Sequence, residues 1–152
     1  MIELTVYGIP APQGSKRFIG HAKSGRGIMV ESSKKVKPWR EAVKSAVIDY
    51  TEKHGLQYDI NGRLFYGPVL LNLFFTLPKP KSAPKTRRTF PDKKPDLSKL
   101  IRSTEDALTD AGVWEDDARV VCCLAKKLYP GEGAEALGIP GAIIRVSQYL
   151  DQ

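Results

Sequence analysis

The sequence predicts an α+β fold in which two helices cover one face of a four-stranded mixed sheet. Its length of 152 residues suits a single domain with one hydrophobic core. Segments with the hydrophobic periods of strands and helices follow one another in the order β-α-β-α-β-β. We find no internal repeat. We therefore treat residues 1–152 as one domain, with basic loops at about 13–33 and 78–95.

The first half of the chain contains one strand, one long loop and one helix. Residues 2–7 alternate apolar and polar side chains, as a half-buried strand does. A Gly, Ser and Lys-rich stretch then runs to about residue 33 without an apolar period, which predicts a loop with at most a short hairpin. Pro38 suits the first turn of a helix that Gly55 closes. Apolar residues at three- and four-residue steps form its inner face: Val36, Trp39, Val43, Ala46, Val47 and Tyr50.

The second half adds a strand, a basic arm, a helix and two strands. Residues 68–77 are rich in branched and aromatic side chains and predict a strand. The Pro, Lys and Arg-rich residues 77–95 cannot pack a core and predict an exposed arm. A helix is expected from about 97 to 111, with Gly112 as its C-cap. Strands are expected at about 119–129 and 142–149. The inner face of this helix is predicted to hold Leu97, Leu100, Ile101, Thr104 and Leu108.

The composition favours a cytoplasmic protein that does not enter a membrane. No stretch approaches the ~20 apolar residues of a membrane span, and the N-terminus lacks the pattern of a secretion signal. Cys122 and Cys123 are adjacent and so cannot form a normal structural disulfide with each other. We expect them to be small buried residues in a reducing compartment.

The net charge of +7 is concentrated in two segments. Residues 10–45 and 79–102 each hold nine Lys or Arg against two acidic residues, so the rest of the chain is acidic. Clustered cations bind polyanions by releasing counterions from phosphates, which indicates a nucleic-acid partner. A solvated basic surface explains the charge alone equally well.

Acidic residues flank the second predicted helix. Asp96 directly follows the basic arm, and Asp116 and Asp117 lie where the chain leaves the helix for the next strand. If the helix and its return bring Asp96 and Asp117 together, their carboxylates would suit a magnesium-dependent phosphodiesterase, because hard oxygen ligands hold a metal that activates water. Alternatively, Asp96 is an N-cap and the Asp116-Asp117 pair is a solvated turn.

Residues 96–121, DLSKLIRSTEDALTDAGVWEDDARVV, resemble the motif of the RusA family of Holliday junction resolvases. That motif runs Asp-x-Asp-Asn-Leu-x-Lys, then Asp-Ala-Leu, then a turn and Asp-Asp before the next strand. The resemblance implies that Asp96 and Asp117 bind the metal and act in catalysis, with Asp116 as an acidic neighbour of the metal. Asp106 matches the aspartate of Asp-Ala-Leu, and Arg102 stands where the family has its catalytic lysine.

The chain departs from the motif at Ser98, which replaces the second aspartate, and at Lys99, which replaces the asparagine. Serine is a neutral ligand, so its presence should weaken magnesium binding. Arginine at 102 keeps the positive charge but cannot lose a proton at working pH. Helical spacing places Glu105 and Asp106 on the face of position 98, and we expect Asp106, rather than Glu105, to complete the site.

The resemblance further implies an endonuclease that uses Mg²⁺, with Mn²⁺ as the alternative metal, to cut branched DNA such as four-way junctions. It also implies a homodimer, since two paired cuts match two-fold symmetry. Three rivals remain: a branched-DNA-binding protein with weakened cleavage, which Ser98 and Arg102 favour; an RNA-binding module; and a basic structural domain. Phe90 is a candidate to stack on or insert into DNA. The candidate cationic contacts are Lys16, Arg17, Lys85, Arg87, Arg88, Lys93, Lys94 and Lys99.

Overall fold

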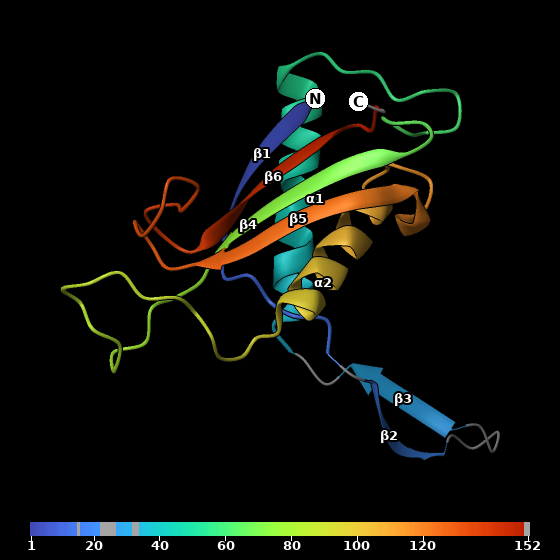
Figure 1. Ribbon diagram of the computed structural model, residues 1–152. Coiled ribbons are helices and arrows are strands. Elements are labelled where there is room, and N and C mark those ends of the chain that lie inside the picture. The colour runs from blue at the N-terminus through green and yellow to red at the C-terminus, as the bar shows by residue number, and fades with distance from the viewer. Residues whose placement is uncertain (15, 22–26, 32–33, 151–152) are drawn as a thin grey trace.

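The computed structural model describes residues 1–14, 16–21, 27–31 and 34–150, and it confirms the α+β architecture (Figure 1). Helices α1 and α2 lie against one face of a four-stranded sheet, and the β2–β3 hairpin extends away from it. The elements are β1 (Ile2–Tyr7), β2 (Lys16–His21), β3 (Gly27–Glu31), α1 (Val36–Lys53), β4 (Val69–Thr76), α2 (Leu97–Asp110), the 3-10 turn η1 (Asp117–Arg119), β5 (Val120–Leu128) and β6 (Gly141–Gln148).

The sheet has the strand order β1-β6-β4-β5, with β4 and β5 parallel and the other neighbours antiparallel. Strand β4 is central because both of its edges are paired, and Val69, Leu71, Leu73 and Phe75 on one of its faces are fully buried. Strands β1 and β5 form the two edges of the sheet. The mixed sheet that the sequence predicted is thus confirmed. Of its two edge strands, β5 has the larger number of exposed residues.

The two helices bury most of the residues that their apolar periods predict. Trp39 and Val43 of α1 and Leu108 of α2 are fully buried, and the Trp39 Nε1 donates a hydrogen bond of 3.1 Å to Thr104 Oγ1. This bond joins α1 to α2 in the core. The predicted inner residues Leu97 and Ile101 are only half-buried, and the small residues Ser103 and Ala107 lie inward instead.

The cysteine prediction is wrong, because Cys122 and Cys123 are both exposed. They lie on the edge strand β5, which has a neighbour on one side only. Although the residue as a whole is exposed, partial burial of its thiol and the nearby charge of Glu105 raise the pKa of Cys123 to about 11, so the thiol stays protonated at neutral pH. In the part of the chain that the structure describes, no helix is long and apolar enough to cross a membrane.

Candidate functional site

Three carboxylates gather at the C-terminal half of α2. Glu105 and Asp106 come from the helix, and Asp117 comes from the chain that returns past it. Burial, Asp117 and Asp106 together raise the pKa of Glu105 to about 7. The pKa of Asp106 is raised as well, by burial, by the charge of Asp117 and by a hydrogen bond between the two side chains. Such mutual repulsion shows that the three groups lie within electrostatic reach of one another.

The turn after α2 explains how Asp117 reaches the helix. Gly112 adopts a φ of +79°, and a Cβ there would lie 2.7 Å from the Gly62 carbonyl oxygen, so only glycine fits this close approach. The buried Trp114 then donates its Nε1 proton to Thr109 Oγ1 at 2.7 Å. The Thr109 hydroxyl in turn donates to Asp117 Oδ1. The carboxylate of Asp117 is therefore held against the last turn of α2.

Asp116 is adjacent to this cluster but is engaged with the backbone. Its side chain caps η1 by accepting a hydrogen bond of 2.7 Å from the Ala118 amide. The exposed residues around it form an ion pair, Glu115 to Arg119 at 2.6 Å. The alternative of a solvated turn thus describes Asp116 well, whereas Asp117 faces the helix.

Asp96 lies at the opposite end of α2. It occupies the N-cap position without a capping side-chain hydrogen bond, and it pairs with Lys99 at 3.7 Å. Thr109, the partner of Asp117, lies thirteen positions after Asp96, and a helical rise of 1.5 Å per residue makes that about 20 Å. The expectation that the helix and its return bring Asp96 and Asp117 together does not hold within a single chain.

The carboxylates have the chemistry of a magnesium site but do not form a complete one. Oxygen donors are what Mg²⁺ prefers, and Glu105, Asp106 and Asp117 supply them with negative charge in excess. Across the described residues, however, no group of three or more His, Cys, Asp or Glu side chains is placed to hold a metal ion. In one chain, the carboxylates that the motif singles out are therefore divided between the two ends of α2.

The residues that depart from the family motif lie on the exposed side of α2. Ser98 and Arg102 are both exposed. The positive charges of Arg40 and Arg102 oppose the rise in the pKa of Asp106. Arg102 is thus a local counter-charge to the acidic cluster, while Lys99 is the counter-charge at Asp96.

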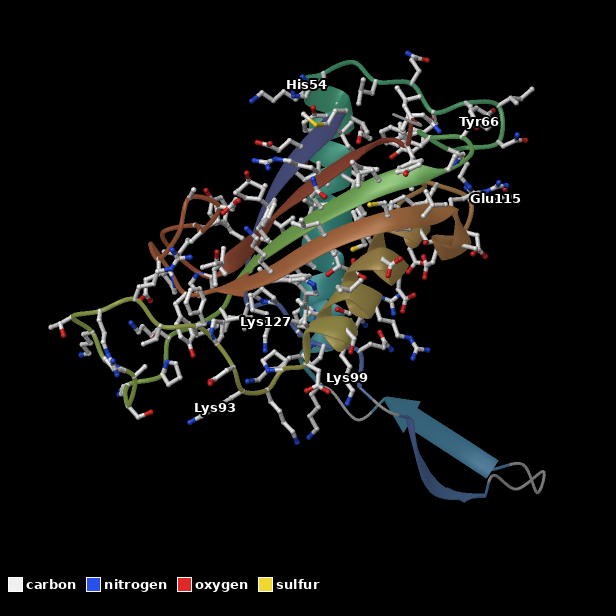
Figure 2. The ribbon with its side chains drawn as sticks, in the orientation of Figure 1. His54, Tyr66, Lys93, Lys99, Glu115 and Lys127 are labelled. Atoms are coloured by element: carbon white, nitrogen blue, oxygen red, sulfur yellow. The ribbon has the colours of Figure 1, made fainter. Side chains whose placement is uncertain are left out.

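The predicted DNA contacts of the arm lie in one exposed segment. Phe90 is 60% exposed, and the Arg88 guanidinium lies 4.8 Å from the centre of its ring. Lys85, Arg87, Lys93 and Lys94 are exposed as well. Figure 2 shows Lys93 and Lys99 near the start of α2, with Glu115 at the far end of the domain.

Three other basic residues differ in what the structure shows of them. Lys127 donates hydrogen bonds of 2.9 Å and 3.0 Å to the carbonyls of Lys93 and Pro95, which fixes the end of the arm to β5. Lys16 and Arg17 begin β2, but their side chains lie outside the described part of the structure.

The sequence did not single out Thr109 and Lys127 for these positioning roles. The Thr109 hydroxyl orients Asp117, and the Lys127 ammonium holds the backbone just before Asp96. No local sequence signal identifies them, because both contacts join segments that meet only in the folded chain.

Replacing Glu105 with Gln should stabilise the metal-free protein at high pH. Folding raises the pKa of Glu105, which means that its ionised form destabilises the folded protein. At pH 4 the carboxyl is protonated and costs the wild-type protein no stability, whereas above about pH 7 it is ionised and the full cost is present. Because water screens this half-buried group, we expect a gain of about 1–2 kcal/mol at pH 8 and none at pH 4. Denaturant unfolding in the presence of a chelator measures both values, and an equal effect at the two pH values would contradict the repulsion.

The fold and the cluster define a class of small α+β protein in which a basic arm precedes the helix α2 and a carboxylate cluster lies at the other end of that helix. Residues 9–137 match the family model described as endodeoxyribonuclease RusA, and the chain belongs to that family. The family is one of endodeoxyribonucleases, enzymes that cut within DNA chains. A search of curated proteins finds no match.

Proposed function

We propose that this protein is a Mg²⁺-dependent endonuclease that resolves four-way DNA junctions in recombination and repair. The observation that carries the proposal is the family match over residues 9–137, which contains both the acidic cluster and the basic arm. Asp106 and Asp117 converge at positions that the family motif reserves for carboxylates. The exposed cations of the arm would hold phosphates without reading bases, as recognition of DNA shape requires.

The proposed chemistry divides between the metal and the chain. Bound Mg²⁺ would supply activation of water and stabilisation of phosphate charge. Asp117 and Asp96 would hold it, with Asp106 as the further carboxylate that replaces the missing aspartate at Ser98. The Thr109 hydroxyl fixes the orientation of Asp117, and Arg102 would place its positive charge beside the phosphate.

The two ends of α2 act together only if a second copy supplies one of them, which supports a homodimer. Strand β5 offers the contact, because it is a sheet edge with unpaired backbone groups on its outer side. Its apolar residues Val121 and Leu124 are 56% and 47% exposed. A long apolar edge strand in an isolated chain is a template for pairing with another strand.

Because α2 and β5 run in opposite directions, pairing through β5 would bring the start of one α2 helix near the end of the other. Lys127 at the end of β5 contacts Pro95 before α2, while Asp117 just before β5 contacts Thr109 at the end of α2, so the two elements run in opposite directions. A two-fold axis through β5 would place the two copies of α2 side by side and antiparallel. Helices in contact lie about 8–10 Å apart, so Asp96 of each copy would approach the Asp117 cluster of the other.

Replacing Leu124 with Glu should therefore separate the dimer. The two copies of position 124 would lie close to the two-fold axis, where like charges repel and an apolar contact is lost. We expect the dissociation constant to rise at least about a hundredfold, measured by light scattering over a dilution series. Ile48→Glu, on the exposed side of α1, is the matched control and should leave the dimer intact. Monomers of the unaltered protein at high concentration would contradict the proposed interface.

The proposed function is tested with a synthetic four-way DNA junction and a linear duplex of the same sequence. We expect paired nicks near the crossover in Mg²⁺, none in the duplex, and none when the metal is chelated. A second candidate, a junction-binding protein without cleavage, is favoured by Ser98 and Arg102. Tight junction binding with no product in Mg²⁺ or Mn²⁺ would replace the first function with the second.

A further inference from the structure

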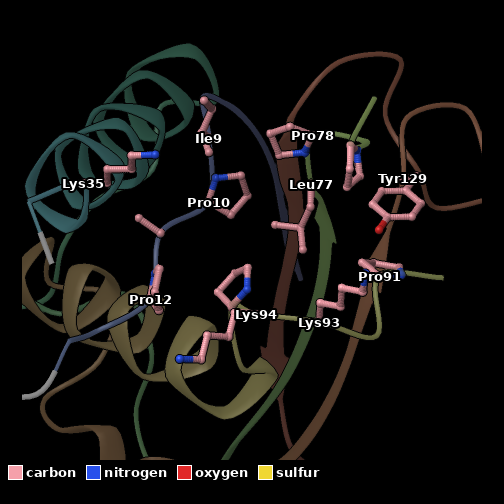
Figure 3. Close-up of a pocket in the computed structure, with 13 residues that line it drawn as sticks. Ile9, Pro10, Pro12, Lys35, Leu77, Pro78, Pro91, Lys93, Lys94 and Tyr129 are labelled. Atoms are coloured by element: carbon pink, nitrogen blue, oxygen red, sulfur yellow. The ribbon is translucent and has the colours of Figure 1, made fainter. Parts of the chain in front are cut away.

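An apolar cavity of about 400 Å³ lies between the N-terminal segment after β1, the basic arm and the ends of β4 and β5. Figure 3 shows Pro10 and Pro12 on one side of it and Leu77, Pro91 and Tyr129 on the other. Pro10, Leu77, Pro91 and Tyr129 are buried. Burial and the nearby charges of Asp92 and Glu132 raise the pKa of Tyr129, so its ring is uncharged at neutral pH.

The rim of the cavity is cationic. Lys35, Lys93 and Lys94 are exposed residues among those that line it, and the lining contains no carboxylate. An apolar slot with a positive rim matches a flat ring that is covalently attached to phosphates. It does not match a free apolar ligand, which gains nothing from three ammonium groups, or a free phosphate, which gains nothing from proline walls.

The walls are fixed before any ligand arrives. The Gln13 amide donates to the Lys99 carbonyl at 3.0 Å, which ties the N-terminal wall to α2. Lys127 ties the opposite wall to β5 through the carbonyls of Lys93 and Pro95. Sites that bind small rings are mostly preformed and apolar, with volumes of about 300–1,000 Å³, and this cavity has those properties.

The cavity is also next to one end of the proposed catalytic site. Pro95 lines it and is followed directly by Asp96. DNA whose phosphate lies near Asp96 would have an adjacent nucleotide within reach of the cavity mouth. Bases at a branch point are the least costly to unstack, because their stacking is already disturbed.

We propose that this cavity binds one nucleobase extruded from the DNA next to the cut, while Lys35, Lys93 and Lys94 hold its flanking phosphates. The proposal deepens the proposed function, on which it rests, and adds a base-binding site to the phosphate contacts. Proline and tyrosine faces accept any base by stacking, so the site would favour an unpaired nucleotide over a paired one.

The test uses the full-length protein and an end-labelled duplex that carries one bulged adenosine, compared with the same duplex carrying an abasic bulge. We expect the abasic probe to bind about tenfold more weakly, since stacking of one base on such a surface has this magnitude. Ile9 lines the cavity and is 54% exposed, which makes it the position for the test. Ile9→Trp should fill the mouth of the cavity and remove this difference while leaving the affinity for the abasic probe within about twofold. Ile60→Trp, at a side chain that is 97% exposed and outside the cavity lining, is the matched control.

Equal affinity of the unaltered protein for the two probes would overturn the base-binding site, as would a preference that persists in Ile9→Trp. The unchanged binding of the abasic probe shows that the variant is folded. Cleavage does not enter this measurement. A protein that prefers the bulged base but cuts no four-way junction would overturn the proposed function and leave the cavity assignment intact.

Discussion

Replacing Asp117 with Asn is expected to reduce Mg²⁺-dependent cleavage of a four-way junction at least about a hundredfold, the loss of roughly 3 kcal/mol of transition-state stabilisation. Asparagine keeps the shape of the side chain and can still accept the Thr109 hydrogen bond, so the turn after α2 should fold as before. It removes the negative charge that a divalent cation needs. Junction affinity should stay within about threefold, because the arm that we propose to bind phosphate is untouched.

The comparison variant is Asp49→Asn, which removes a carboxylate from the exposed side of α1. It should leave both cleavage and binding unchanged. Rates are compared under single-turnover conditions at saturating protein, so that weaker binding does not appear as slower chemistry. Undiminished cleavage by Asp117→Asn would remove the acidic cluster from the catalytic site.

Replacing Ser98 with Asp is expected to raise cleavage about tenfold when Mg²⁺ is limiting. Ser98 is exposed two residues after Asp96, on the same end of α2. A carboxylate there would add a full negative charge to the proposed cage and restore the second aspartate of the family motif. The gain should shrink at saturating Mg²⁺, because the substitution strengthens metal binding more than it changes the chemical step.

A matched substitution, Ser45→Asp on the exposed side of α1, controls for the change in net charge. A titration of Mg²⁺ at fixed ionic strength separates metal affinity from the maximal rate. If Ser98→Asp leaves the Mg²⁺ dependence unchanged, position 98 does not face the metal. In that case the proposed site of Asp96, Asp117 and Asp106 would have no place for a carboxylate at position 98.

Most of the fold follows from the periodicity of the sequence. The alternation in residues 2–7 specifies β1, and the spacing around Trp39 and Val43 specifies the buried face of α1. The apolar content of β5 did not reveal that it lies at an edge, since Val121 and Leu124 would serve a central strand equally well. Strand order depends on contacts between distant segments, and composition does not encode it directly. The exposure of Cys122 and Cys123 therefore required the structure.

The acidic cluster was predicted in part. The motif identified Asp106 and Asp117, and the turn at Gly112 brings Asp117 back to α2. Asp96 was expected beside them, but a continuous helix separates its two ends by about 20 Å. That distance follows from the helix length alone. The proposed site is completed by a second copy of the chain, and the sequence does not reveal where that copy lies.

The most direct test of this account mixes two inactive variants, Asp96→Asn and Asp117→Asn, co-expressed with different tags and assayed on a four-way junction in Mg²⁺. If each site joins Asp96 of one copy to Asp117 of the other, every mixed dimer contains one intact site and one doubly altered site. Random pairing would then restore about a quarter of the wild-type sites, seen as single nicks. A mixture as inactive as its components would show that the two aspartates do not act together across the dimer.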